Sequence, residues 1–360
     1  MIRLTIAVAI GGPLVVVAAL VTASGRGLPV PAVPVAIGVV ALLGAVLVVT
    51  LRRSRRWGAV GVVTNAALAF VWSGYWAAPL APPAPLAGEL PAASPPSEMR
   101  LWQLPTGAIH RTAAFGYRGG AFSERRDFVM TATLVEHPRG AILIDTGFGR
   151  AIAEQLKTMP LFFRVVTNLE RTRSVAEQLD AAGFDRARLR GVVLTHAHWD
   201  HVSGLGELPT VPVLVNADER RFIDGGGWIT RLARDVGARL EEYRFDGGPY
   251  LGFPSSHDLF GDGSVVIVPA PGHTPGSVVV FVALPTGKRY AFVGDLVWQR
   301  EGITEREERP WIVGALGDHD PARLRESLLR VAAIHARFPE VTLVAAHDPR
   351  GFATLPTLRR

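Results

Sequence analysis

Three histidines and one aspartate crowd into a single short segment of this chain, as His196, His198, Asp200 and His201. The apolar, β-branched residues 191–195 directly before them predict a strand, so the cluster lies in the turn where that strand ends. Neutral imidazole and carboxylate are ligands that zinc-like ions favour, whereas core packing gives no reason for such crowding. A solvated surface cluster is the alternative, and the ligand-like spacing disfavours it. The segment therefore predicts a metal site, and the fold must bring further ligands to it.

Three more candidate ligands each follow a predicted strand. They are His273 after residues 265–268, Asp295 after residues 290–293, and His347 after residues 341–345. Catalytic and binding groups often lie in such strand-end loops on a rigid scaffold. A lone histidine is more often structural, and that interpretation applies to His110, His137, His257 and His335.

The rest of the catalytic region predicts a layered α/β fold. Residues 129–135 and 141–144 are strand-like and are joined by a turn signal at residues 137–140, and residues 278–282 predict a further strand. Residues 174–182 predict a helix, and a second helix begins at Pro321 after an Asp320 cap and continues to about Ala336. Strands in two groups with helices outside them fit an α/β sandwich. Periodicity alone leaves the topology open.

The N-terminal region predicts a membrane anchor. Residues 4–23 and 30–51 are uncharged apolar runs, and each is long enough to span a bilayer as a helix. Residues 57–78 form a third, less pure run that ends in aromatic residues typical of a membrane interface. A cleaved signal peptide is the alternative for the first run, although the second run disfavours it. A buried core helix is the alternative for the third.

The arginines between the second and third runs predict the orientation of the anchor. Residues 52–56 contain four arginines, so the positive-inside rule places this loop in the cytoplasm. If the third run spans, the chain is a multi-pass protein of the cell membrane and its catalytic domain is extracytoplasmic. The Pro-rich residues 79–97 predict an extended spacer. The chain thus divides into an anchor at 1–78 with two or three transmembrane helices, a linker at 79–97 and a catalytic domain at 98–360.

Charge and cysteine content exclude several functions. The net charge is +6, and residues 1–97 hold six arginines against one glutamate, which leaves 32 basic and 31 acidic residues in 98–360. A catalytic region this close to neutral gives no sign of a basic surface for binding nucleic acid, and nucleic acid is not expected as a partner. The expected partners are a small-molecule substrate and, through the anchor, membrane lipid. Because the chain has no cysteine, a thiolate nucleophile and a thiolate metal ligand are both impossible.

Together these motifs resemble those of metallo-β-lactamase-fold hydrolases. Residues 196–201 look like the HxHxDH signature, and His273, Asp295 and His347 match the later motifs in order. Residues 143–147, Leu-Ile-Asp-Thr-Gly, look like the early turn of that family. The resemblance covers roughly residues 99–350. It implies an αββα sandwich behind the predicted transmembrane helices.

The resemblance also implies a role for each residue. His196, His198 and His273 would hold one metal, Asp200, His201 and His347 a second, and Asp295 would bridge the two. Asp145 would orient a ligand without binding metal. Two divalent transition-metal ions are implied, with zinc favoured, although the same ligands suit iron, manganese or cobalt. A metal-bound hydroxide would attack an ester or lactone carbonyl, and Asp200 would act catalytically by passing a proton to the leaving oxygen.

Within the superfamily, the N-acyl-homoserine lactonase group is the most similar. Shared features include the segment Gly272-His273-Thr274-Pro275-Gly276. In that group a tyrosine three residues after the bridging aspartate assists the substrate carbonyl, and here that position is Trp298. An indole donates one hydrogen bond but cannot act as an acid, so Trp298 is expected to form a wall of the substrate pocket.

Two other classes of function remain open from the sequence. A glyoxalase-II-like thioesterase or a phosphodiesterase would use the same ligands, but no separate substrate-recognition region is visible. A non-catalytic, metal-dependent membrane sensor is the third possibility. The complete set of seven ligands disfavours a sensor, because degenerate members tend to lose ligands.

Overall fold

The computed structural model describes residues 73–358 of the chain. The apolar runs at residues 4–23 and 30–51, and residues 57–72 of the third run, lie outside the described residues. Within residues 73–358, no helix is both long enough and apolar enough to cross a bilayer.

The first of two β-sheets has seven strands in the order β4-β1-β2-β3-β5-β6-β7. Their bounds are β1 Arg100–Thr112, β2 Arg125–Glu136, β3 Ala141–Ile144, β4 Leu169–Arg171, β5 Leu189–Val193, β6 Val213–Val215 and β7 Leu240–Glu242. Strands β1 and β2 form a long antiparallel pair, and β3, β5, β6 and β7 run parallel to one another. The carboxyl ends of parallel strands lie at the same edge of a sheet. The loop that follows β5 at this edge contains the histidine cluster.

The second sheet has five strands in the order β12-β11-β10-β9-β8. Their bounds are β8 His257–Asp258, β9 Val265–Pro269, β10 Val278–Ala283, β11 Arg289–Gly294 and β12 Val341–Ala345. Strands β11 and β12 are parallel, so their carboxyl ends lie next to each other.

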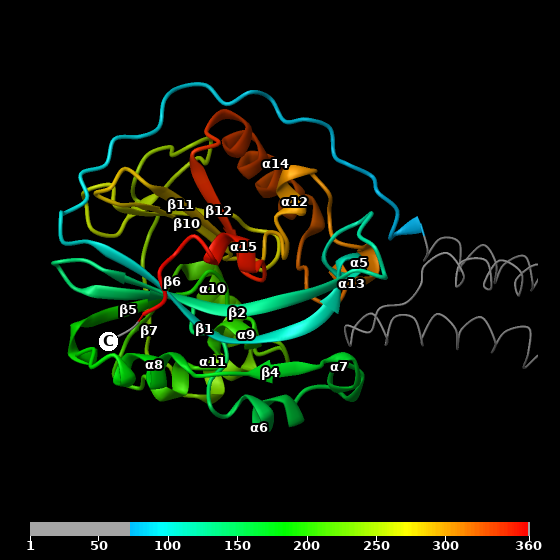
Figure 1. Cartoon of the computed structure of the whole chain (residues 1–360), viewed down its shortest axis with the longest axis horizontal. Helices are drawn as coiled ribbons and strands as arrows, with labels where there is room; N and C mark the ends of the chain where they lie inside the picture. Colours follow the sequence, from blue (N-terminus) through cyan, green and yellow to red (C-terminus); the bar gives the residue numbers. More distant parts are fainter. Residues whose placement is uncertain (1–72, 359–360) are drawn as a thin grey trace, which may run out of the picture.

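The helices of the described chain are α5 Ala113–Gly116, α6 Ile152–Lys157, α7 Leu161–Val166, α8 Val175–Ala181, α9 Trp199–Val202, α10 Ala217–Gly225, α11 Arg231–Asp235, α12 Glu301–Thr304, α13 Trp311–Gly314, α14 Pro321–Arg337 and α15 Pro349–Phe352. Figure 1 shows the sheets between α12 and α14 on one side and α6, α8 and α11 on the other. The predicted αββα layering is therefore observed.

The central strands β3, β9 and β10 are buried on both faces, which explains why they are continuously apolar in the sequence. Ile142 and Ile144 of β3 pack between the sheets, whereas Leu143 packs on the helical layer outside. In β9, Ile267 points between the sheets and Val268 points toward α14. The alternation follows from the two-residue period of a strand.

The predicted elements correspond closely to observed ones. Strands 141–144 and 341–345 have the predicted bounds, and the turn at residues 137–140 joins β2 to β3. Helix α8 begins after a Ser174–Glu177 capping box, and α14 begins at Pro321 after an Asp320 cap. The strand predicted at residues 191–195 instead ends at Val193. Thr195 leaves the sheet because its backbone N–H and hydroxyl both donate to the Asp145 carboxylate.

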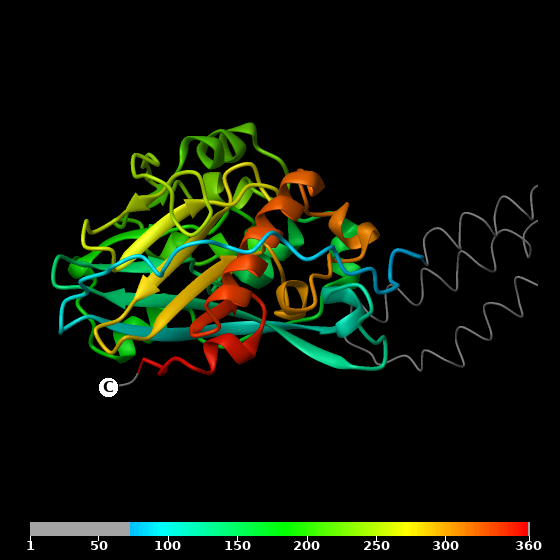
Figure 2. The ribbon, with the colours of Figure 1, turned by 90° about the horizontal axis from the view of Figure 1, so that it is seen from above.

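The Pro-rich residues 79–97, called the strap below, are extended but are not a free spacer. Leu80, Leu86 and Leu90 pack against the hydrophobic cluster that α14 forms with the second sheet. Backbone hydrogen bonds join Leu80 N to Arg306 O and Ser94 N to Asp262 O. Figure 2 shows the strap crossing the molecule over α14 and the second sheet.

The segment just before the strap also belongs to the globular body. The Tyr75 ring is buried against Phe122, with ring centroids 5.1 Å apart, and Ala114 completes the cluster. The backbone N–H of Ala78 donates to Glu307. Within residues 73–78, Gly74, Tyr75 and the backbone of Ala78 therefore pack on the catalytic domain, whereas Trp76 is exposed.

Candidate metal centre

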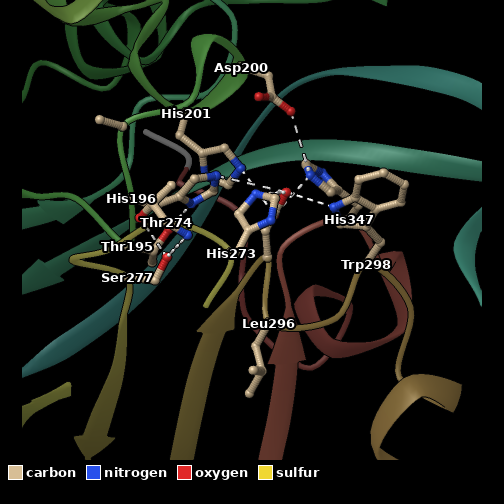
Figure 3. A network of polar contacts seen from close by, with 12 residues as sticks. Thr195, His196, Asp200, His201, His273, Thr274, Ser277, Leu296, Trp298 and His347 are labelled. Atoms are coloured by element: carbon tan, nitrogen blue, oxygen red, sulfur yellow. Dashed lines mark hydrogen bonds and ion pairs between the residues drawn. The ribbon is translucent and has the colours of Figure 1, made fainter. Parts of the chain in front are cut away.

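The seven predicted ligands come from four strand ends and meet at one place between the sheets. His196 and His198 lie in the loop after β5, and Asp200 and His201 lie in α9. His273 follows β9, and Asp295 and His347 directly follow β11 and β12. All seven side chains are buried. Figure 3 shows the imidazoles of His196, His201, His273 and His347 pointing toward one another, with Asp200 close by.

The ligand atoms are close enough to share metal ions. Three overlapping groups each have their ligand atoms within 4.8 Å of one another: His196, His198 and His273; His196, His201 and Asp295; and Asp200, His201 and His347. Asp295 lies between them, because its Oδ2 is 3.4 Å from Nε2 of His273 and its Oδ1 is 3.0 Å from Nε2 of His347. Two of these groups coincide with the two implied ligand sets, and the third joins one residue of each set with Asp295. Their metal-binding roles stay a prediction.

The hydrogen bonding of these side chains fits a metal site. Among the described residues, Nε2 of four histidines and Oδ1 of Asp295 are buried without a hydrogen-bond partner; the histidines are His196, His198, His201 and His273. Buried polar atoms are almost always satisfied, and each exception calls for an explanation. Five such atoms in one cluster of overlapping ligand groups are explained by cations that they would ligate.

The opposite ring nitrogens are held by the protein. Nδ1 of His201 is 2.8 Å from Asp145 Oδ2, and Nδ1 of His273 is 2.7 Å from Asp318 Oδ1. Nδ1 of His347 is 3.0 Å from the Val129 carbonyl oxygen. A partner on Nδ1 fixes the ring orientation and leaves Nε2 for a metal. Asp145 thus lies where a ligand-orienting residue is expected.

Electrostatics also favour cations at this point. Burial lowers the pKa of His196 and His198 well below the ordinary value, so these rings stay neutral and can ligate. Against the effect of burial, Asp145 and Asp295 raise the pKa of His201 well above its ordinary value. The centre therefore carries a surplus of carboxylate charge that a proton or a metal ion must balance.

Three supporting residues were not found by sequence reasoning. The Glu219 carboxylate accepts hydrogen bonds from Ala197 N at 2.6 Å, Thr274 Oγ1 at 2.6 Å and Gly276 N at 3.0 Å. It therefore joins the loop that carries His196 and His198 to the loop that carries His273. Burial raises the pKa of Glu219 to about 7.

The other two missed residues are Asp318 and Arg309. The Arg309 guanidinium donates to Asp318 and to the Asp295 carbonyl oxygen, and it stacks on the Trp298 ring at 4.6 Å. None of the three has a local signal. Glu219 follows Asn216 by three residues, a spacing that looks like an ordinary helix cap.

Trp298 lies beside the centre, and the residue is more than a wall. Its ring stacks on Phe115 with centroids 5.5 Å apart, and it lines the pocket described below. Its Nε1–H donates to Asp295 Oδ2 at 2.7 Å. The indole N–H is therefore engaged by the proposed bridging carboxylate.

A deep apolar pocket of about 490 Å³ opens onto the centre. Five predicted ligands form its floor: His198, Asp200, His273, Asp295 and His347. Its walls are mainly apolar and aromatic and include Phe115, Phe128, Met130, Phe163 and Trp228. Arg111 is the one arginine or lysine among the lining residues, and its guanidinium already donates to the Val166 carbonyl. None of the four histidines predicted to be structural lines this pocket.

Comparison with known proteins identifies the fold and the kind of site. Residues 125–347 match the family model described as the metallo-beta-lactamase superfamily. A Mycobacterium bovis protein named "probable metallo-hydrolase" is 31% identical over 229 residues, which are 60% of this chain and 73% of the relative. The N-acyl homoserine lactonase AttM of Rhizobium radiobacter is 26% identical over 231 residues, covering 61% of this chain and 82% of the relative.

A solved structure shares the architecture. An N-acyl homoserine lactone hydrolase with N-hexanoyl-L-homoserine bound at its catalytic metal centre superposes with a TM-score of 0.58 at 15% identity, covering 74% of this chain and 98% of that chain. At this level of identity the similarity concerns the fold.

Proposed function

The chain belongs to the metallo-beta-lactamase superfamily and is a metal-dependent hydrolase, and on that premise we propose that it is a dinuclear enzyme that cleaves a lactone or ester. One observation carries the proposal. Five buried ligand atoms without hydrogen bonds lie in one cluster of overlapping ligand groups, and His198, His273 and Asp295 of that cluster line an apolar pocket. The lactonase among its relatives supports the choice of reaction.

The residues present fit two divalent ions. His196, His198 and His273 would hold one ion, Asp200, His201 and His347 the other, and Asp295 would contact both. When bound, such ions supply an acidified water nucleophile and polarise the carbonyl oxygen under attack. Zinc is the ion proposed, because the ligand set is imidazole and carboxylate without thiolate.

The side chains of this chain position the reaction and handle its proton. Asp200 lines the pocket floor, and its Oδ2 is 3.5 Å from His347 Nε2. From this position its carboxylate can take a proton from the attacking water and pass it to the leaving oxygen of a substrate seated in the pocket. Asp145 and Asp318 keep His201 and His273 in fixed orientations. Apolar walls exclude water from the reacting bond.

The pocket favours a carbonyl substrate with an apolar tail. Its volume is that of an ordinary small-ligand site, and its walls would bury an acyl chain. A phosphodiester is disfavoured because its polar groups beyond the proposed ions would meet mainly apolar walls, and the one arginine in the lining is already hydrogen-bonded to the backbone. A thioester is the second candidate, because the same walls would accept its acyl group. A sensor without activity is disfavoured by the full ligand set.

The test is a substrate panel on the full-length, metal-loaded protein in detergent. We expect hydrolysis of acyl lactones or esters, with weaker activity on thioesters and none on phosphodiesters. His110→Gln is the matched control, because His110 lies outside the pocket, in a pair with Asp127. A fully metal-loaded protein that cleaves no member of the panel would overturn the proposal in favour of a sensor.

The localisation remains part of the proposal. Four arginines in residues 52–56 support an extracytoplasmic catalytic domain behind a multi-pass anchor. Protease added to intact spheroplasts is expected to digest residues 98–360. Full protection of this region would place it in the cytoplasm.

A further inference from the structure

Large exposed apolar side chains gather around the pocket mouth. In residues 73–358 they are Trp76, Leu161, Phe162, Val165, Trp311 and Leu316, and together they are called the rim below. Phe162 and Leu316 line the pocket itself. Leu161 and Val165 lie on α7 with Phe162. Trp311 begins α13, whose Ile312 and Val313 also line the pocket. Large exposed apolar patches on soluble proteins often mark an interaction surface.

Helix α7 is apolar on opposite sides. Phe163 and Val166 turn into the pocket, while Leu161 is 70% exposed and Val165 is 46% exposed. None of its residues is buried. A helix that stays within one globular body normally turns polar residues outward, so this one is built for an apolar neighbour on its outer side. Arg164, exposed on the same helix, suits the headgroup level of a bilayer.

The described chain begins at the rim. Gly74 packs so closely on the Trp311 ring that a Cβ would not fit there, and Trp76 follows two residues later. Figure 1 shows this first segment at the same end of the molecule as α5 and α13. The 72 residues that precede it include the two long uncharged apolar runs. An anchor whose last helix ended near residue 72 would place the rim next to the bilayer.

We propose that the rim docks on the lipid bilayer, so that the pocket mouth lies at the membrane surface and an amphiphilic acyl substrate enters from the lipid. Apolar and aromatic side chains of this kind bury in the interfacial region of a bilayer. The docking follows from the rim and the anchor alone. Entry of substrate from the lipid rests also on the proposed hydrolase function.

The absence of cysteine makes the docking directly testable. Leu161→Cys in the full-length protein would carry the single thiol for an environment-sensitive fluorophore, and the protein is placed in phosphatidylcholine and phosphatidylglycerol vesicles. Lys288→Cys is the control, because Lys288 is exposed in the turn before β11, at the end of that strand opposite the metal ligands. We expect a blue-shifted emission at position 161 that lipids with a spin label on the acyl chain quench strongly, and no quenching at position 288.

Two results would overturn the docking. One is a position-161 probe that aqueous iodide quenches as fully as the control while the spin-labelled lipid does not. The other is efficient disulfide crosslinking of two Leu161→Cys chains without lipid quenching, which would assign the rim to a second copy of this chain.

Entry of substrate from the lipid is tested by placing negatively charged side chains on the rim. Leu161→Glu with Val165→Glu should lower kcat/KM roughly tenfold on a long-chain acyl lactone held in vesicles. The same variant should leave activity on a short, water-soluble lactone unchanged, as should Lys288→Glu on both substrates. An equal loss on both substrates would overturn entry from the lipid. If the unaltered protein hydrolyses no lactone, the hydrolase proposal fails, and the fluorescence result still decides the docking.

Discussion

The indole N–H of Trp298 donates a 2.7 Å hydrogen bond to Oδ2 of Asp295, the carboxylate proposed to bridge two metal ions. In the lactonase group that the sequence resembles, a tyrosine at this position serves the substrate. Here the Trp298 side chain instead donates to a proposed metal ligand, and the Arg309 guanidinium packs on the Trp298 ring. If the substrate is a lactone or ester as proposed, its carbonyl would be polarised without a donor from this position.

Replacing Trp298 separates its two contacts. Trp298→Phe keeps an aromatic wall but removes the hydrogen bond to Asp295. Removing a group that orients a metal ligand typically lowers metal affinity or activity by about 10–100-fold. We therefore expect the metal affinity and the kcat of Trp298→Phe to fall by about tenfold. Chelator competition and steady-state kinetics measure the two effects. A change confined to KM would show that the ring acts only as a wall.

Glu219 is expected to stabilise the centre without touching substrate. Glu219→Gln replaces one acceptor oxygen with an NH2 group that would face hydrogen-bond donors. Leaving such buried groups unsatisfied costs about 1–3 kcal/mol of folding stability. We expect a lower free energy of unfolding in urea and weaker metal retention. Glu241→Gln is the control, since Glu241 is exposed in β7. Equal stabilities of the two variants would contradict the role.

Asp200 is expected to matter more for turnover than for metal retention. Asp200→Asn keeps a ligand oxygen but cannot pass a proton, so kcat should fall by about 10²–10⁴-fold. Elemental analysis of the same sample should show a much smaller change in metal content. Full activity in this variant would remove Asp200 from the proton-transfer step.

Metal content provides a prediction independent of substrate. The full-length protein purified with metal present should contain two transition-metal ions per chain. His273→Ala and His347→Ala should each weaken a different ion, because the two residues fall in separate ligand groups. Elemental analysis and metal titration distinguish the two. One ion in the unaltered protein would contradict a dinuclear site.

The strap should contribute to stability. A chain beginning at Glu98 loses the leucines at positions 80, 86 and 90, each partly buried on the hydrophobic cluster that α14 forms with the second sheet. At about 1 kcal/mol for each, the loss is roughly 3 kcal/mol, or about 5–10 °C in Tm for a domain of this size. Calorimetry of chains beginning at Ser73 and at Glu98 measures it. Equal Tm values would show that the strap is only a tether.

Local sequence patterns predicted a layered α/β fold with candidate ligands in the loops after apolar strands, and the family resemblance added the αββα layering and the division of the seven ligands. Strand β1 was missed, since Pro105 and Gly107 interrupt it; the pairing with β2 shifts register at that point. Glu219, Asp318 and Arg309 could not be found, because their partners lie far away in the sequence. Only the fold reveals such pairs.

The candidate ligands are divided between the two sheets: those at 196–201 follow a strand of the first, and His273, Asp295 and His347 follow strands of the second. Ions held by both groups would act as a reversible crosslink between the two halves of the sandwich. Disulfides commonly serve this purpose, but this chain has no cysteine. Binding free energy at such a junction is also folding free energy. The metal supply where the chain matures would then control how long the enzyme survives, in addition to whether it is active.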